Sequence, residues 1–173
     1  VKIAGAAALA GKSLEEVATI AQGFADNMAT LSVAASGATN PATGMEIAQV
    51  AAGCMEVGVG LHGEAGKAKP MATAEETVSA MLDALLEDLN VLAEEKLMVI
   101  VSGSGATSLM EQLIVYRNCY AYLVEKEIEI VASHVGELMT VQEMAGFEIC
   151  IARMNEELVE YWNAPCRTPY FKK

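Results

Sequence analysis

The run L-M-V-I-V, residues 97 to 101, constrains the fold more than any other stretch of this chain. It is continuously apolar and has the length of a strand, which is the pattern of a strand covered on both faces. The segment S-G-S-G-A-T-S follows it and leads into a predicted helix from about residue 109 to 125. A buried strand that runs into a helix predicts a layered α/β domain.

Helices and strands alternate along the rest of the chain. Ser13 to Glu16 and Thr73 to Glu76 are capping boxes, each of which predicts the start of a helix. Further helices are expected before Gly11 and, in the C-terminal part, from Asn155 to Trp162. Strands are expected at residues 30–35, 55–62, 97–101, 128–132 and 146–154. No repeat or linker divides the sequence, so a single domain covering residues 1–173 is predicted.

Composition excludes several classes of function. The net charge of −12 disfavours nucleic acid and anionic membrane surfaces as partners. No apolar run approaches the roughly 18 residues of a membrane span, and the N-terminus lacks a secretory signal. The cysteines are too widely spaced for a zinc site and are expected to be reduced thiols of a cytoplasmic protein: Cys54, Cys119, Cys150 and Cys166. Because the chain starts at Val1, inside an apolar run, we expect it to be a piece of a larger protein.

Two patterns that can mark active sites have ordinary structural explanations here. Gly103-Ser104-Gly105 lies between a predicted strand and a predicted helix, but it lacks the third glycine of a dinucleotide fingerprint and the lysine of a P-loop. A tight connection is therefore favoured over a phosphate site. The paired glutamates lie mainly in first turns of helices, where they complement the helix dipole: Glu15-Glu16, Glu75-Glu76, Glu94-Glu95 and Glu156-Glu157.

The histidines give the sharpest functional hypothesis. His62 and His134 are isolated from other ligand types, so no metal site is predicted. His62 ends the run M-E-V-G-V-G-L-H-G-E-A-G and stands between Gly60 and Gly63, where no side chain crowds its ring. An imidazole in that position could act as a nucleophile, a base or a ligand, and the alternative is a histidine with only a structural role in a turn.

At this point the sequence resembles a known family, the K subunits or K domains of dihydroxyacetone kinases. M-E-V-G-V-G-L-H-G-E-A-G is similar to the family's substrate-histidine motif, and S-G-S-G-A-T-S-L-M-E resembles its N-x-L-G-A-T-x-x-x-E segment. V-G-E-L-M-T-V-Q-E-M-A-G-F and W-N-A-P-C-R-T-P resemble two later family segments, in the same order. Ser102 and Arg167 depart from the family pattern. The resemblance covers the whole chain but only the C-terminal part of the family subunit.

The resemblance implies a fold and a role for His62. The expected fold is an α/β, two-layer domain with a mixed β-sheet covered by helices. The histidine matching His62 would add to the carbonyl of a short ketose and form a hemiaminal, with Gly60 and Gly63 beside the substrate. A histidine side chain has an unperturbed pKa of about 6.5, so the neutral imidazole that this addition needs is available near neutral pH.

The resemblance also implies partners. The family's acid and base residues lie in an N-terminal half that this sequence lacks. ATP and Mg²⁺, or a nucleotide recharged by a phosphotransferase protein, would be held by a separate L subunit or domain, and no cofactor is expected on this chain itself. A homodimer is expected because family members commonly pair. Two alternatives stay open: a co-activator that binds the ketose without phosphorylating it, and a shortened domain with no activity of its own.

Overall fold

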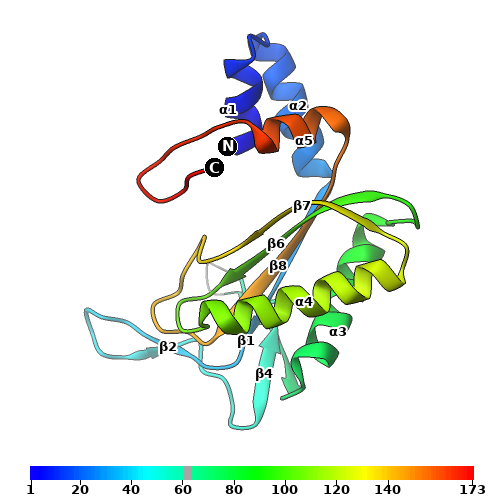
Figure 1. Cartoon of the computed structure of the whole chain (residues 1–173). Coiled ribbons are helices and arrows are strands. Elements are labelled where there is room, and N and C mark those ends of the chain that lie inside the picture. The colour runs from blue at the N-terminus through cyan, green and yellow to red at the C-terminus, as the bar shows by residue number, and fades with distance from the viewer. Residues whose placement is uncertain (61–63) are drawn as a thin grey trace.

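The computed structural model describes residues 1–60 and 64–173 (Figure 1). The helices of these residues are α1 (Lys2–Leu9), α2 (Leu14–Asp26), α3 (Ala74–Leu89), α4 (Leu109–Glu125) and α5 (Glu156–Asn163). The strands are β1 (Met28–Ala34), β2 (Ala38–Thr39), β3 (Glu46–Ile47), β4 (Cys54–Val57), β5 (Lys67–Pro70), β6 (Lys96–Gly103), β7 (Glu129–Val135) and β8 (Gly146–Arg153).

The main sheet has six strands in the order β5-β4-β1-β8-β6-β7. Only the β6–β7 pair is parallel among these described strands, and the other neighbours are antiparallel. The predicted α/β fold with a mixed sheet is therefore confirmed. No helix within residues 1–60 and 64–173 is long and apolar enough to cross a membrane.

Capping boxes begin three of the described helices. The Ser13 hydroxyl accepts a hydrogen bond from the Glu16 amide at 3.2 Å, and Glu16 Oε2 accepts one from the Ser13 amide at 2.7 Å. Thr73 begins α3 with the same reciprocal pair, as predicted. Ser108 begins α4 in the same way, a third capping box that was not predicted. Each box satisfies amide donors that the first turn of a helix leaves without partners.

One face of the sheet is covered by α3 and α4 (Figure 1). Alternate residues of the central strands point into this layer, as the period of a strand requires. The buried side chains contributed by β1, β6 and β8 are Ala29, Val33, Leu97, Val99, Val101, Ile149 and Ile151. This layer is the larger core of the protein and contains alternate residues of the predicted run at 97–101.

The opposite face is covered by α1, α2 and α5 only at one end, where these helices cluster (Figure 1). There Met98 of β6 and Ala152 of β8 are buried against α1 and α5. The same face changes character along the strands, because the residues toward their other end are polar. The resulting polar region is the position of the candidate site.

Two predictions from the sequence need correction. The strand predicted at residues 55–62 ends at Val57, because Gly58 adopts φ +85, a left-handed conformation that a strand does not accommodate. No strand was predicted between residues 63 and 73, but an edge strand, β5, lies there and pairs antiparallel with β4. Its exposed K-A-K-P sequence lacks the apolar alternation by which strands are identified.

Candidate functional site

A row of polar side chains crosses three central strands of the sheet. Ser32 of β1 and Ser102 of β6 are both register partners of Glu148 on β8, so the three side chains lie on one face. Thr30 follows on the same face of β1, and Glu56 continues the row on β4 through its pairing with Ala34. No described helix covers this part of the face, which leaves it open to a ligand.

A cavity of about 570 Å³ lies over this polar face. Its floor is formed by β1, β4 and β8 and its walls by the segments 47–49, 59–65 and 139–144, as far as these are described. The volume falls within the range of about 300–1,000 Å³ that is usual for small-molecule sites.

Two residues that flank the segment 61–63 contribute to one wall of the cavity, Gly60 and Glu64. The Gly60 amide donates a hydrogen bond to the Glu64 carbonyl at 2.9 Å, and the Ser32 hydroxyl donates one to the Val59 carbonyl at 2.5 Å. The predicted site residues His62 and Gly63 lie outside the described residues, so their role stays a prediction.

At two glycines of this part of the chain, Gly60 and Gly66, an added side chain would collide with a neighbouring group. A Cβ at Gly60 would lie 2.0 Å from Oε2 of Glu64. A Cβ at Gly66 would lie 2.8 Å from the carbonyl oxygen of Val57, which is backbone and cannot move aside freely. Close approach of the backbone therefore explains the glycine at position 66, whereas at position 60 the neighbouring atoms all belong to the Glu64 side chain.

Glu148 is a partly buried carboxylate in the lining of the cavity. Its side chain is half-buried, and no group of residues 1–60 or 64–173 donates a hydrogen bond to it. Burial raises the pKa of the Glu148 carboxyl above its usual value. Sequence reasoning missed this residue, although a charged side chain inside the otherwise apolar pattern F-E-I-C-I is a signal that could have identified it.

The segment S-G-S-G-A-T-S supports the cavity wall instead of forming a phosphate site. The Ser104 amide donates to the Gly146 carbonyl and the Ala106 amide to the Met144 carbonyl, both at 3.0 Å. These amides are thus not available to an anion, whereas phosphate-binding turns point theirs at the ligand. The Ser104 carbonyl in turn accepts a bond of 2.7 Å from the amide of Val141, a residue of the cavity wall.

Hydrogen bonds from a second set of polar side chains fix the position of the loop after β7. Ser102 Oγ accepts hydrogen bonds from the amides of Leu138 and Met139, at 3.1 and 3.4 Å. Gln112 Nε2 donates to Glu137 Oε1 at 2.6 Å, just behind Gly103, where any Cβ would clash with both side chains. None of these supporting roles was predicted, because they depend on contacts between distant segments.

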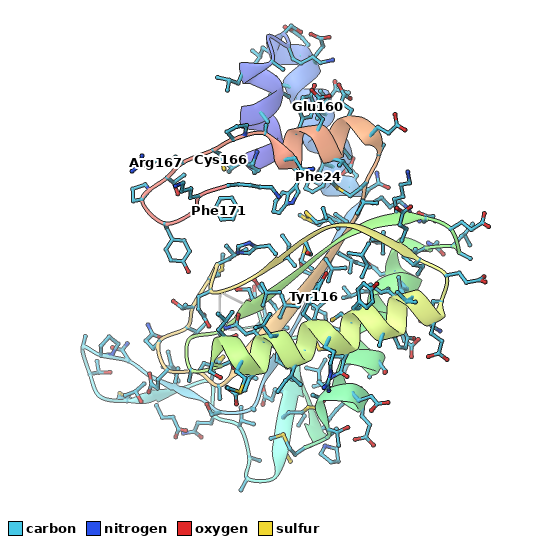
Figure 2. The ribbon with its side chains drawn as sticks, viewed as in Figure 1. Phe24, Tyr116, Glu160, Cys166, Arg167 and Phe171 are labelled. Carbon is cyan, nitrogen blue, oxygen red and sulfur yellow. The ribbon has the colours of Figure 1, made fainter. Side chains whose placement is uncertain are left out.

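The other candidate residues lie apart from the cavity. His134 of β7 meets the ring of Phe171 edge-on, with 5.2 Å between centroids, and burial is the main cause that lowers its pKa. Figure 2 shows Phe171 in the C-terminal tail and Tyr116 on α4, on opposite sides of the sheet edge that β7 forms. Neither His134 nor Phe171 is among the described cavity residues, and residues 1–60 and 64–173 contain no metal-ligand cluster of three.

The paired glutamates have structural roles: the capping boxes were predicted from the sequence, and the two ion pairs were not. Glu16 and Glu76 complete capping boxes. Glu95 forms an ion pair with Arg153, with 2.5 Å between Oε2 and Nε, and Glu157 pairs with Lys12 at 3.1 Å. The four cysteines are free thiols, with Cys119 and Cys150 buried.

Comparison with known proteins places this arrangement in a family. The chain is 36% identical over 172 residues to the dihydroxyacetone-binding subunit DhaK of a PTS-dependent dihydroxyacetone kinase of Listeria innocua, covering 99% of this chain and 52% of the relative. It is 34% identical to an L-erythrulose kinase of Pectobacterium atrosepticum, covering 99% of this chain and 30% of that protein. The chain thus spans about half of the first relative's length and less of the second's.

Solved structures share the fold. A structure described as the dihydroxyacetone kinase operon co-activator DhaQ superposes with a TM-score of 0.88 at 25% identity, over 95% of this chain and 51% of that one. The dihydroxyacetone kinase of C. freundii, in complex with AMP-PNP and Mg²⁺, superposes with a TM-score of 0.77 at 27% identity, over 92% and 29% of the two chains. The Dak1 domain family matches residues 1–170, and the chain therefore belongs to this family.

Proposed function

We propose that this chain is the ketose-binding, C-terminal part of a dihydroxyacetone kinase K subunit, and that His62 captures the substrate covalently. The observation that carries the proposal is the cavity on the polar face of the sheet, because both Gly60 and Glu64 line it. These residues adjoin the segment 61–63 that contains the histidine. Membership of a family whose relatives are named for dihydroxyacetone binding supports the same assignment.

In the proposed step, the Nε2 lone pair of neutral His62 adds to the carbonyl carbon of the ketose. The π electrons of the carbonyl move to its oxygen, which takes up a proton while the ring gives up the one on Nδ1, so a neutral hemiaminal results. A polyol such as glycerol has no carbonyl and cannot form this bond. The adduct also orients the terminal hydroxyl for phosphoryl transfer, a gain in positioning.

Gly60 and Gly63 are proposed to contact the substrate through their backbone. Position 60 supports this role, because the residue lines the cavity and a Cβ there would collide with the Glu64 side chain as it now lies. The substrate is dihydroxyacetone or a related short ketose, and the cavity volume of about 570 Å³ admits ketoses of three or four carbons.

The phosphoryl group is proposed to come from ATP with Mg²⁺ on a separate L subunit or domain. The family's acid and base residues would be supplied by an N-terminal half of the K subunit, with the complete subunit forming a homodimer. The relative solved with AMP-PNP and Mg²⁺ is a longer protein of which this chain matches 29%, which fits a division of labour between parts.

The test uses the full protein that carries this chain and dihydroxyacetone labelled isotopically at its carbonyl carbon. Carbon NMR should show the carbonyl signal move to the range of a tetrahedral carbon, and native mass spectrometry should show one added ketose per site. His62→Ala should abolish both signals, and glycerol should give neither. His134→Ala is the matched control, because the chain's other histidine lies away from the cavity and should leave the adduct intact.

A second candidate is a co-activator that binds the ketose without phosphorylating it. The structural similarity to the operon co-activator, with a TM-score of 0.88, supports this alternative. ATP-dependent turnover of dihydroxyacetone by the full protein with its L subunit distinguishes the two. Turnover supports the kinase, whereas adduct formation without turnover supports the co-activator.

A further inference from the structure

The charged side chains that line the cavity all carry the same sign. They are Glu56, Glu64 and Glu148, and no lysine, arginine or histidine is among the described lining residues. A cavity lined in this way repels anions, because few mobile ions or waters screen charges inside a concave site.

Glu148 lies on β8 between its register partners Ser32 and Ser102, and no described residue donates a hydrogen bond to it. Its register partners Ser32 and Ser102 donate their hydroxyl protons elsewhere, to the carbonyls of Val59 and Gly103, at 2.5 and 3.2 Å. A carboxylate only accepts hydrogen bonds, so the group is complementary to a ligand that brings hydroxyl donors. Burial raises the pKa of Glu148, which is consistent with a carboxylate that receives no hydrogen bond from a described residue.

We infer that Glu148, assisted by Glu56, is a specificity-determining residue that makes the cavity accept neutral polyhydroxylated ketoses and reject their phosphate esters. The inference rests on the proposed function and extends it to the discrimination between substrate and product. Hydroxyl groups of the neutral ketose donate to the carboxylates. The phosphate monoester adds up to two negative charges, for which the site provides no cation within its described lining.

The two backbone amides of the nearby turn at residues 103–106 that form internal hydrogen bonds do not offset this repulsion. The turn at residues 103–106 lies against the cavity through Ser104, yet its Ser104 and Ala106 amides are bonded to the carbonyls of Gly146 and Met144. Phosphorylation of the bound ketose would therefore turn a favourable contact with Glu148 into a repulsive one. The same charge that helps to hold the substrate promotes release of the product.

The experiment compares dissociation constants of dihydroxyacetone and dihydroxyacetone phosphate for the full protein, by titration calorimetry. Both ligands contain the same ketone, so the comparison isolates the effect of the phosphate charge. The wild-type protein should bind the neutral ketose at least about tenfold more tightly than the ester. Glu148→Gln should reduce the ratio of the two dissociation constants, ester over ketose, by about three- to tenfold. Glu56→Gln should reduce this ratio less. Glu129→Gln removes an exposed carboxylate from β7 of the same sheet and should leave the ratio unchanged.

The possible outcomes separate the inference about Glu148, that it makes the cavity reject phosphate esters, from the proposed function. This rejection of esters is called the charge filter below. If the ketose binds but the ester binds equally well, or if both cavity variants keep the wild-type ratio, the charge filter is wrong and the proposed function stands. If Glu129→Gln changes the ratio as much as Glu148→Gln does, the effect is one of net charge and the inference also fails. If the wild-type protein binds neither ligand, both the inference and the proposed function fail.

Discussion

Gln112 of α4 and Glu137 of the loop after β7 are joined by a hydrogen bond of 2.6 Å between Nε2 and Oε1. Gln112 is 1% exposed and also donates to the Thr107 carbonyl at 2.8 Å, so one buried amide links the start of α4 to the loop that continues into the cavity wall. Oε1 of Gln112 and Oε2 of Glu137 have no partner in the part of the chain that the structure describes. The pair is therefore sensitive to substitution.

Removal of this amide should destabilise the fold. Gln112→Ala takes away both hydrogen bonds and leaves a buried carboxylate oxygen without a donor, for an expected loss of about 1–3 kcal/mol in the free energy of unfolding. Urea denaturation measures the change. Gln22→Ala is the matched control, because Gln22 is exposed on α2 and bonds only to the exposed Asp26. A loss as small as that of the control would show that the Gln112–Glu137 bond contributes little.

Two glycines with positive φ should respond differently to alanine. Gly105 has φ +128, and a Cβ there would lie 1.9 Å from the carbonyl oxygen of Gln142. Gly44 has φ +68 with no atom within 4 Å. Gly44→Ala should therefore cost only the left-handed conformation, about 1–2 kcal/mol. Gly105→Ala adds a backbone clash beside the cavity and should cost at least about 3 kcal/mol. Equal losses of unfolding free energy would contradict the close contact.

The Arg153–Glu95 pair should make stability depend on pH in the acid range. The hydrogen bond from Arg153 is the main cause that lowers the pKa of Glu95. A carboxyl whose pKa is lower in the folded state stabilises the fold above its unfolded pKa, and this contribution is lost as the pH falls through the folded pKa. Arg153→Gln should lose about 1 kcal/mol near neutral pH, and the difference from wild type should shrink in acid.

Denaturation curves over a pH series check this prediction. Lys126→Gln is the control, since Lys126 pairs with Asp83 at 3.7 Å on the surface and should show no measurable change in stability. A difference between Arg153→Gln and wild type that stays constant with pH would mean that Glu95 is not the titrating partner.

Glu148 should have the opposite pH dependence. Its pKa is raised by burial, so the fold carries no penalty below the unfolded pKa and becomes less stable as the pH rises through the folded pKa. Glu148→Gln should therefore raise the melting temperature near neutral pH, and the gain should vanish in acid. Such a gain in stability at a residue proposed to bind substrate is the usual trade-off with function. A variant less stable than wild type at neutral pH would show that the carboxylate has a stabilising native partner.

Much of the secondary structure could be predicted because its causes are local. The capping boxes at Ser13 and Thr73 begin α2 and α3 as predicted, and the apolar run at residues 97–101 lies within a strand that is buried between its neighbours. The edge strand β5 was missed because its exposed residues owe their strand conformation to pairing with β4 and not to their own pattern. The predicted β4 strand was too long because Gly58 permits both a strand and the left-handed turn that it adopts.

The sequence by itself determined the family and the order of the helices and the central strands, and it gave the prediction that His62 is the reactive residue, since these follow from motifs and local periodicity. The tertiary structure alone decided where the cavity lies. Glu56, Glu148 and Ser32 are far apart in the chain, and only the antiparallel pairing of β1 with β4 and β8 brings them together on one uncovered face. The register between strands depends on packing of the whole sheet, which no single segment of the sequence encodes.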